Sequence, residues 1–221
     1  MRKKFELTSE TKAPFGIPLF RIKALISFSD VEAGELGGYI EKEDNLDHEG
    51  DAWVSGDARV YGDARVSGDA RVYGDAQVSG YAWVSGDARV YGDAQVSGYA
   101  WVYGDARVYG DARVYGDARV SGDAWVSGDA WVSGDADYFC VKGAGRENRN
   151  TTFFKCESGF VRVNCGCFYG TLAEFASKVH ETHGGKVYEQ EYNAVIELVK
   201  IHFGLDDVND VVNDAPESHE D

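Results

Sequence analysis

The sequence predicts a mainly β protein whose centre is a parallel β-solenoid and whose C-terminal part is a small α+β domain. Between residues 52 and 136, alanine stands at every sixth position, fifteen times in all, and valine follows two places later fourteen times. Apolar residues at two alternate positions of a glycine-punctuated hexad are typical of short strands with one buried face. Repetition of such a unit predicts a solenoid.

The glycines exclude a helical interpretation of the same pattern. The stretch GDARVYGDARVSGDARVY, residues 56 to 73, contains three hexads, and each begins with glycine. One glycine in every six residues would cost a helix about 1 kcal/mol each relative to alanine. The unit Gly-Asp/Tyr-Ala-x-Val-Ser/Tyr is therefore predicted to form one short strand and one turn.

The hexad Val-Ser-Gly-Asp-Ala-Arg resembles the hexapeptide repeat of left-handed parallel β-helices. In that family three hexads form one triangular coil, so the resemblance implies about five coils for residues 46–136. Its left-handed sense is implied by the resemblance alone, because parallel crossovers are usually right-handed. The stretch GELGGYIEKEDNLDHEGDAWVSG also resembles uncharacterised hexapeptide-repeat proteins of bacteria and their prophages, over roughly residues 17–136.

The interior of such a coil has room for three alanines and three valines, and these small side chains fill it to native density. We therefore expect no pocket inside the solenoid. Function is expected on its outer faces, at its ends or in the flanking segments.

One outer face is predicted to carry an aromatic patch. Residues eighteen apart share a face, and on this face the repeat's aspartate is replaced by Tyr81 and Tyr99, each two residues before Trp83 or Trp101. Tyr103 stands at the corner. An exposed apolar patch indicates a contact surface, so we expect a partner protein or a second copy, as in a homotrimer. A stacking platform for a sugar or base, and packing under a folded-back terminus, remain alternatives.

The charge of −16 disfavours direct binding to nucleic acid or to an acidic membrane surface. The chain has no apolar run of the eighteen or so residues that span a bilayer, and its first residues do not form a signal peptide, so a cytoplasmic protein is expected. The stacked aspartates are expected to be screened by the arginine two residues further on. A calcium ladder and a mimic of a nucleic-acid surface, directed at a host protein, are the alternatives.

Many hexapeptide-repeat proteins are acyltransferases, in which a histidine base and inserted loops bind the acceptor and coenzyme A. Residues 51–136 contain no histidine, no lysine and no insertion. A general base must reach the group that it activates, and the nearest histidine, His48, is expected to cap the first coil as an inward or half-buried residue. The sequence thus predicts a non-catalytic, phage- or prophage-type interaction protein without a cofactor. An acyltransferase with sites at the solenoid ends is the alternative.

The N-terminal segment, residues 1–45, is predicted to form a β cap. Residues 19–28 alternate as a strand with Ile22, Ala24, Ile26 and Phe28 on one side. Gly34, Gly37 and Gly38 are expected to turn the chain into the first coil. A cap is needed because an open solenoid end invites polymerisation.

Residues 137–204 are predicted to form the α+β domain. A hairpin is expected to turn at residues 157–159 and to place Val161, Val163, Cys165 and Cys167 on one face. A capping box at residues 171–174 begins one helix, and a second helix is expected from Glu189 to Phe203, burying Tyr192, Val195, Ile196 and Val199 before Gly204 ends it. The stretch NTTFFKCESGFVRVNCGCF resembles a small domain found in phage and prophage proteins of Gram-positive bacteria.

The C-terminal third also contains two weak signals for ligand sites and an acidic tail. Cys165 and Cys167 with His180 and His183 have the residue types of a zinc site but an unusual spacing, so buried thiols are favoured and no metal site is predicted. The loop GAGRENRN, residues 143–150, including Asn148, could hold an anion, but a polar loop is favoured. Residues 205–221 are predicted to be an acidic, disordered tail, with seven acidic and no basic residues from position 206.

Overall fold

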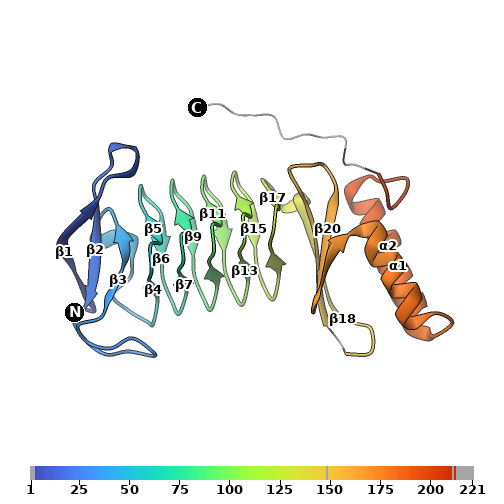
Figure 1. Cartoon of the computed structure of the whole chain (residues 1–221), viewed down its shortest axis with the longest axis horizontal. Helices are drawn as coiled ribbons and strands as arrows, with labels where there is room; N and C mark the ends of the chain where they lie inside the picture. Colours follow the sequence, from blue (N-terminus) through green and yellow to red (C-terminus); the bar gives the residue numbers. More distant parts are fainter. Residues whose placement is uncertain (1–2, 148, 211, 213–221) are drawn as a thin grey trace.

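A computed structural model describes residues 3–147, 149–210 and 212. The molecule is elongated, with an antiparallel β cap at one end, five parallel coils in the middle and a sheet with two helices at the other end (Figure 1). The predicted architecture is therefore confirmed: a mainly β protein with a five-turn parallel β-solenoid and an α+β C-terminal region. No helix among the described residues is long and apolar enough to cross a membrane.

The solenoid contains fourteen two-residue strands arranged in three parallel sheets. One sheet contains β4 (Trp53–Val54), β7 (Arg71–Val72), β10 (Arg89–Val90), β13 (Arg107–Val108) and β16 (Trp125–Val126). The second contains β6 (Arg65–Val66), β9 (Trp83–Val84), β12 (Trp101–Val102) and β15 (Arg119–Val120). The third contains β5 (Arg59–Val60), β8 (Gln77–Val78), β11 (Gln95–Val96), β14 (Arg113–Val114) and β17 (Trp131–Val132). Each strand pairs with the strand eighteen residues away, as the face assignment predicts.

The repeat's alanines and valines form one continuous core along the whole solenoid. From Ala52 to Val132 every one of them is at most 1% exposed. These side chains fill the space between the three sheets at the density of a protein interior. The outer faces and the ends are therefore the surfaces that the solenoid offers to other molecules.

Glycine is required at the coil corners for two reasons. Gly98 has φ 67°, in the left-handed region that L-residues avoid. A Cβ at this position would also lie only 2.8 Å from the backbone nitrogen of Gly116, one coil further on. The corners therefore stack backbone on backbone.

The N-terminal cap is a three-stranded antiparallel sheet that joins the third solenoid sheet edge to edge. It contains β1 (Phe5–Lys12), β2 (Leu19–Ala24) and β3 (Leu36–Ile40), and β3 pairs in parallel with β5. The predicted strand over residues 19–28 is shorter than expected and ends at Ala24. The prediction that Gly37 and Gly38 form a turn was wrong. They lie inside β3, where a Cβ on Gly38 would lie 2.7 Å from the Ala58 carbonyl oxygen.

The first coil exposes carbonyl oxygens, and the cap supplies hydrogen-bond donors to them. Lys4 Nζ donates to the oxygens of Gly50 at 3.2 Å and Ala52 at 2.9 Å. Asn45, in the short 3₁₀ turn η2 (Glu43–Asn45), donates through Nδ2 to Ala64 O at 2.8 Å. Both capping side chains are almost fully buried. These bonds satisfy carbonyl oxygens that would otherwise lack hydrogen-bond partners at the open end of the solenoid.

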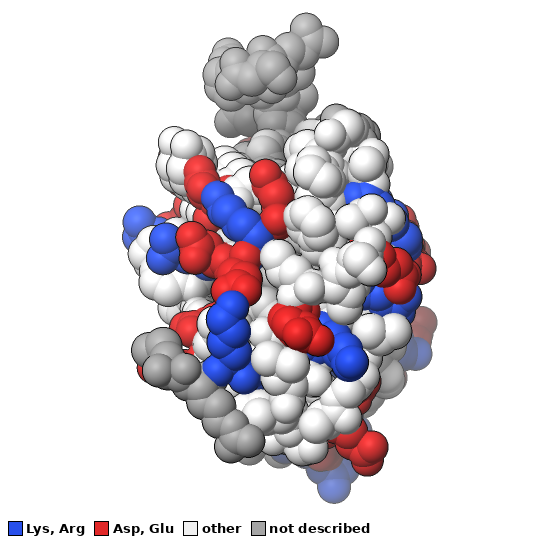
Figure 2. All heavy atoms as spheres, turned by 90° about the vertical axis from the view of Figure 1, so that its left-hand side faces the viewer, with Lys and Arg blue, Asp and Glu red and all other residues white. Residues whose placement is uncertain are grey.

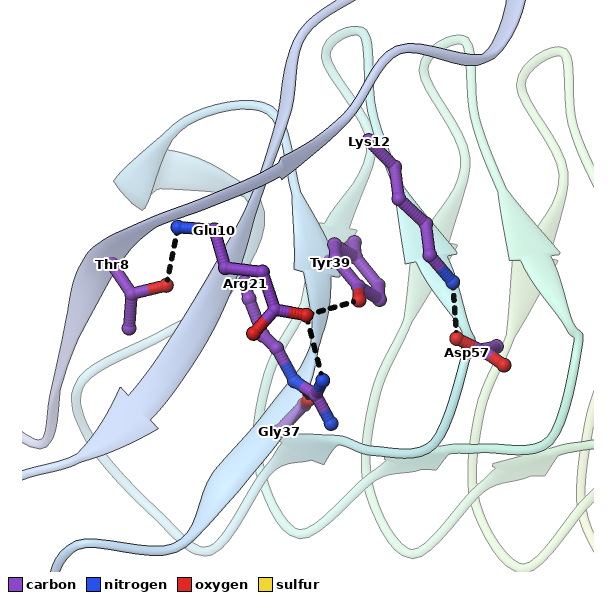
Figure 3. Close-up of polar contacts among 7 residues, drawn as sticks. All are labelled: Thr8, Glu10, Lys12, Arg21, Gly37, Tyr39 and Asp57. Atoms are coloured by element: carbon purple, nitrogen blue, oxygen red, sulfur yellow. Dashed lines mark hydrogen bonds and ion pairs between the residues drawn. The ribbon is translucent and has the colours of Figure 1, made fainter.

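An ionic cluster fastens the outer strands of the cap to the first coil (Figure 3). The Glu10 carboxylate accepts hydrogen bonds from Arg21 Nη1 at 2.8 Å and from Tyr39 Oη at 2.9 Å. Lys12 lies over the Tyr39 ring and forms an ion pair with Asp57 of the first coil. Figure 2 looks onto this end and shows acidic and basic side chains interleaved across it.

The last coil exposes backbone N–H groups, so the segment that covers it supplies hydrogen-bond acceptors instead of donors. The Asp137 carboxylate accepts from Ser133 N at 2.9 Å and Gly134 N at 3.0 Å, and Lys155 lies 2.8 Å away. Burial alone would raise the pKa of Asp137, but its bonds with Lys155 and Ser133 hold the pKa below its usual value. Thr152 Oγ1 accepts from Trp125 N at 3.0 Å.

The C-terminal domain has four antiparallel strands and two helices that lie side by side on the far side of the sheet from the solenoid (Figure 1). The elements are β18 (Tyr138–Ala144), β19 (Arg149–Lys155), β20 (Val161–Cys165), β21 (Phe168–Thr171), α1 (Leu172–His183) and α2 (Val187–Phe203). The predicted hairpin is β19–β20, and its turn is closed by a 2.9 Å bond from Gly159 N to Cys156 O. The predicted capping box at Thr171 and the left-handed Gly204 are also observed.

Two details of the C-terminal prediction were wrong. Cys167 does not share the buried face of Cys165, because β20 ends at residue 165 and Cys167 lies exposed in the following turn. The predicted disordered tail begins with ordered residues: Leu205 is buried in the C-terminal core, and Val212 N donates to Gly159 O at 2.8 Å. Residues 211 and 213–221 of that tail lie outside the described residues.

Replacing Gly98 by alanine is expected to destabilise the solenoid more than the same change at Gly122. Gly122 has a similar φ of 63° but would place its Cβ in open space. Both variants carry the strain of a left-handed alanine, about 1–2 kcal/mol, and Gly98→Ala adds the contact with the next coil, roughly 1 kcal/mol more. Urea unfolding measures the difference, and equal free energies of unfolding would contradict the close stacking.

Replacing Lys4 by methionine is expected to change how stability depends on pH. Burial lowers the pKa of Lys4 to about 8 from a model-peptide value of 10.5. Between these two values the unfolded chain binds more protons than the folded chain, so folding becomes more favourable as pH rises, by at most about 1.4 kcal/mol per unit. The stability of wild type minus that of Lys4→Met should therefore increase from pH 8 to 10. A flat difference in denaturant melts would show that Lys4 is not buried.

Candidate interaction surface

The five predicted aromatic residues lie together on the outer face of the β6–β9–β12–β15 sheet. Their exposed fractions are 57% for Tyr81, 40% for Trp83, 60% for Tyr99, 42% for Trp101 and 40% for Tyr103. β9 and β12 are paired neighbours, with Trp83 opposite Trp101. We call these five residues the aromatic face. Their role in binding stays a prediction.

Four of the five rings of the aromatic face contact one another in two pairs. Tyr81 and Tyr99 stack in parallel with centroids 5.0 Å apart and 5° between planes. Trp83 and Trp101 meet edge to face at 5.4 Å and 71°. Each of the two tyrosine rings thus covers one side of the other. This geometry favours contact with a protein surface over a flat stacking platform for a sugar or base.

Two substitutions in the repeat remove negative charge from the aromatic face. Tyrosine replaces the repeat's aspartate at positions 81 and 99, while the same column carries Asp63 before them and Asp117 after them. The change removes two carboxylates and adds two rings in adjacent coils. The patch is therefore uncharged at its centre and bordered by charged rows.

A second tyrosine column escaped the sequence analysis. Tyr73, Tyr91 and Tyr109 stack on the β4–β16 sheet side with centroids 4.8 and 5.0 Å apart. The signal was present, because tyrosine replaces serine at the last position of three hexads spaced eighteen residues apart. This column is half-buried, and Asn164 Nδ2 donates to Tyr109 Oη at 2.8 Å. It therefore helps to attach the C-terminal domain.

The aromatic face is bordered by a hollow at each end. The N-terminal hollow, which we call the acidic notch, is lined by Asp44, Asp47, Arg65 and Trp83 together with Glu43 and His48. The C-terminal hollow lies between the solenoid and β18, and Tyr103, Arg119, Tyr138, Cys140 and His202 line it. A partner on the aromatic face would meet both hollows.

The predicted screening of the aspartate columns by arginine does not take the form of direct ion pairs, and it stays a prediction. Within the coils, which the structure describes completely, no aspartate lies within 4.0 Å of the arginine two residues further on. Such exposed pairs gain little in water. The ion pairs instead join end coils to the flanks: Lys12 to Asp57, Lys42 to Asp63 and Lys142 to Asp123.

His48 is half-buried, as predicted, and belongs to the cap. Its Nδ1 accepts from Lys4 N at 3.2 Å, and its ring stacks on Phe5 with centroids 4.3 Å apart. The imidazole is thus held within the packing of the first coil. The prediction that the protein is not an enzyme stays untested.

Trp125 and Trp131, predicted to support the C-terminal segment, are half-buried at the last coil, and their strands β16 and β17 lie against β19. Each also carries an arginine of the preceding coil over its ring. Arg107 lies 4.8 Å from the Trp125 ring centroid, and Arg113 lies 5.1 Å from that of Trp131. The arginines of one coil can therefore cover the tryptophans of the next.

Cys165, Cys167 and His183 line one hollow of the C-terminal domain, but their side chains do not form a metal-binding group. Cys165 is buried and accepts from Thr151 Oγ1 at 3.1 Å, whereas Cys167 is exposed. His180 pairs with Glu189 at 2.7 Å. Among the described residues there is no group of three or more His, Cys, Asp or Glu that could hold a metal ion.

A carboxylate of α2 occupies the position in the loop after β18 where the weak anion-site hypothesis expected a ligand. Gly145 N donates to Glu191 Oε2 at 3.0 Å. Asn148, part of the same hypothesis, lies outside the described residues. The observed contact therefore supports the favoured interpretation of a polar loop.

Comparison with known proteins identifies the repeat. A family model described as YdcK Beta solenoid repeat matches residues 52–69, 64–80, 82–98, 100–116, 112–128 and 118–134. Every matched segment lies in the coils, so the chain contains a repeat β-solenoid similar to that family's. The search of curated proteins found no match. Left-handedness and the likeness of the C-terminal domain to phage proteins remain expectations from resemblance.

Iodoacetamide is expected to modify Cys167 much faster than the other three cysteines of the native protein. Cys156 and Cys165 are buried, and burial raises the pKa of the Cys156 and Cys140 thiols, which lowers their thiolate fraction. Mass spectrometry over time should show one fast adduct that Cys167→Ser removes. Slow modification of all four thiols, reversed by a chelator, would instead indicate a metal held by Cys165 and Cys167.

Proposed function

We propose that the protein is a non-catalytic binding protein that holds another protein chain on the aromatic face. The observation that carries this proposal is the exposure of five neighbouring aromatic side chains, each 40–60% accessible. Monomeric soluble proteins rarely expose apolar patches larger than a few hundred Å² unless the patch is a contact surface.

The composition of the aromatic face suits a protein partner. Tyrosine and tryptophan are enriched among the residues that dominate interface energies. The rings are already ordered by stacking, so binding would cost little additional side-chain entropy. The solenoid core is filled by alanine and valine, which supports action through the outside rather than through an internal ligand.

The resemblance of residues 17–136 and of the C-terminal domain to prophage and phage proteins supports a phage- or prophage-type role in the cytoplasm. A host protein is then the natural partner. A second copy of the chain, as in a homotrimer, is the other occupant that the test distinguishes.

Changing the aromatic face back to the repeat's own sequence is expected to abolish binding without unfolding the protein. The variant is Tyr81→Asp/Trp83→Gln/Tyr99→Asp/Trp101→Gln. It copies the Asp-Ala-Gln-Val segments that the repeat itself contains at residues 75–78 and 93–96, so its backbone and core should be unchanged. The measurement is affinity capture from host lysate, with the mass of the purified protein determined by analytical ultracentrifugation. The melting temperature should stay within a few degrees.

The matched control is Gln77→Ala/Gln95→Ala, at the corresponding position of the neighbouring sheet. It should capture the same partners as wild type. If the four-residue variant also captures the same partners and has the same mass in solution, the aromatic face is not the binding surface.

The aspartates of the middle coils support a second candidate, a mimic of a nucleic-acid surface that binds a basic host protein. They are exposed and stand in columns: Asp69, Asp87 and Asp105 in one, and Asp75, Asp93 and Asp111 in another. Binding through these columns would weaken steeply with salt, whereas binding through the aromatic face would weaken much less. Capture at rising salt therefore separates the two functions.

A further inference from the structure

Arginine and tryptophan are neighbours in adjacent coils at five places in the solenoid columns. The pairs are Trp53 with Arg71, Arg65 with Trp83, Trp101 with Arg119, Arg107 with Trp125, and Arg113 with Trp131. In the last three the guanidinium lies over the indole, at 5.6, 4.8 and 5.1 Å from the ring centroid. The coil spacing thus suits a cation–π contact between neighbouring coils.

The pair at the start of the solenoid departs from this pattern for a visible reason. Arg71 forms an ion pair with Asp30 of the loop before β3. The Trp53 ring is covered instead by Phe28, with centroids 5.4 Å apart and 74° between planes. The cap therefore supplies an ion-pair partner to Arg71 and a packing partner to the Trp53 ring.

The pair Arg65–Trp83 has neither arrangement. Among the described residues, Arg65 has no ion-pair partner within 4.0 Å and does not lie over the Trp83 ring. The indole is oriented by a 3.0 Å hydrogen bond from its Nε1 to Ser67 Oγ, and the side chain is 40% exposed. Trp83 is thus the tryptophan of the aromatic face whose ring lacks a cation from its own chain.

The acidic notch lies directly beside this ring. Of its three carboxylates, Glu43 is bound by Lys3 at 2.7 Å and faces His48 at 3.8 Å. Asp44 and Asp47 are exposed and line the same hollow as Trp83, and Arg65 is the guanidinium in the lining. Two carboxylates therefore stand against one guanidinium, which leaves a negative charge for one more cation.

We propose that the acidic notch binds an arginine side chain of the partner protein, with its guanidinium over the Trp83 ring and its N–H groups donating to Asp44 and Asp47. This inference rests on the proposed function and names the chemistry that the aromatic face recognises. Arginine suits the site better than lysine, because its planar group stacks on an indole and donates in a fork to carboxylates at the same time.

The first test is a titration of the ¹⁵N-labelled protein with N-acetyl-L-arginine amide, and with the citrulline analogue as the uncharged control. The indole Nε1–H signal of Trp83, assigned with Trp83→Phe, should shift with the arginine probe and not with citrulline. The signal of Trp53, which is 2% exposed, should not move. Equal shifts with both probes, or none at Trp83, would overturn the proposal.

Two charge variants test the notch itself at physiological salt. Asp44→Asn/Asp47→Asn should weaken the arginine probe roughly three- to tenfold, in line with exposed charge pairs. Asp75→Asn/Asp93→Asn removes the same total charge from another face, so it should leave affinity nearly unchanged. Arg65→Gln removes a like charge from the notch and should strengthen binding. Weaker binding of the arginine probe in Arg65→Gln would overturn the proposal, because removing a like charge from the notch should not weaken the binding of a cation.

These outcomes are independent of the test of the proposed function. Asp44→Asn/Asp47→Asn leaves all five rings of the aromatic face intact. If this variant still captures every partner at wild-type strength while the four-residue aromatic variant captures none, the proposed function stands and the arginine notch is wrong.

Discussion

The structure depends on one constraint: each residue of the coils must stack on the residue eighteen positions further on. The hydrogen bonds between coils, the packing of alanine on alanine and the backbone contact between corner glycines such as Gly98 and Gly116 all use this register. A side chain larger than valine would force the three sheets apart. The same constraint explains why chemical variety appears on the outside, where tyrosine, tryptophan, arginine, glutamine and aspartate exchange without disturbing the core.

A stack of parallel coils has two unlike ends, and the flanking segments reflect this. The first coil presents carbonyl oxygens, so its cap uses donors such as Lys4 and Asn45. The last coil presents N–H groups, so it is closed by acceptors such as Asp137 and Thr152. Both ends are thereby protected from edge-to-edge association with other chains. The side faces remain available, and one of them carries the aromatic face.

The solenoid and the assignment of residues to its faces could be predicted from the sequence, because a strict period fixes which side chains point into the core and which strands stack on one another. The aromatic face followed from the same arithmetic. The bounds of the strands within the predicted cap did not follow in this way, because these strands obey no period. Gly37 and Gly38 resemble a turn in sequence, yet they are needed where β3 crosses the backbone of the first coil. The notch beside Trp83 also could not be predicted, since it joins residues 43–48 to residues 65–83 through coil stacking.

The register itself can be tested most directly by deleting repeats. Removing residues 105–122 deletes one whole coil, so each remaining face still meets the same strands of the C-terminal domain. Removing residues 105–110 deletes one hexad, so every strand after the deletion moves to the next of the three sheets. Equilibrium unfolding in urea should show a cooperative, well-folded protein for the eighteen-residue deletion and a markedly less stable one for the six-residue deletion, despite its smaller loss of core. A six-residue deletion at least as stable as the eighteen-residue one would contradict the three-sided coil on which the account depends.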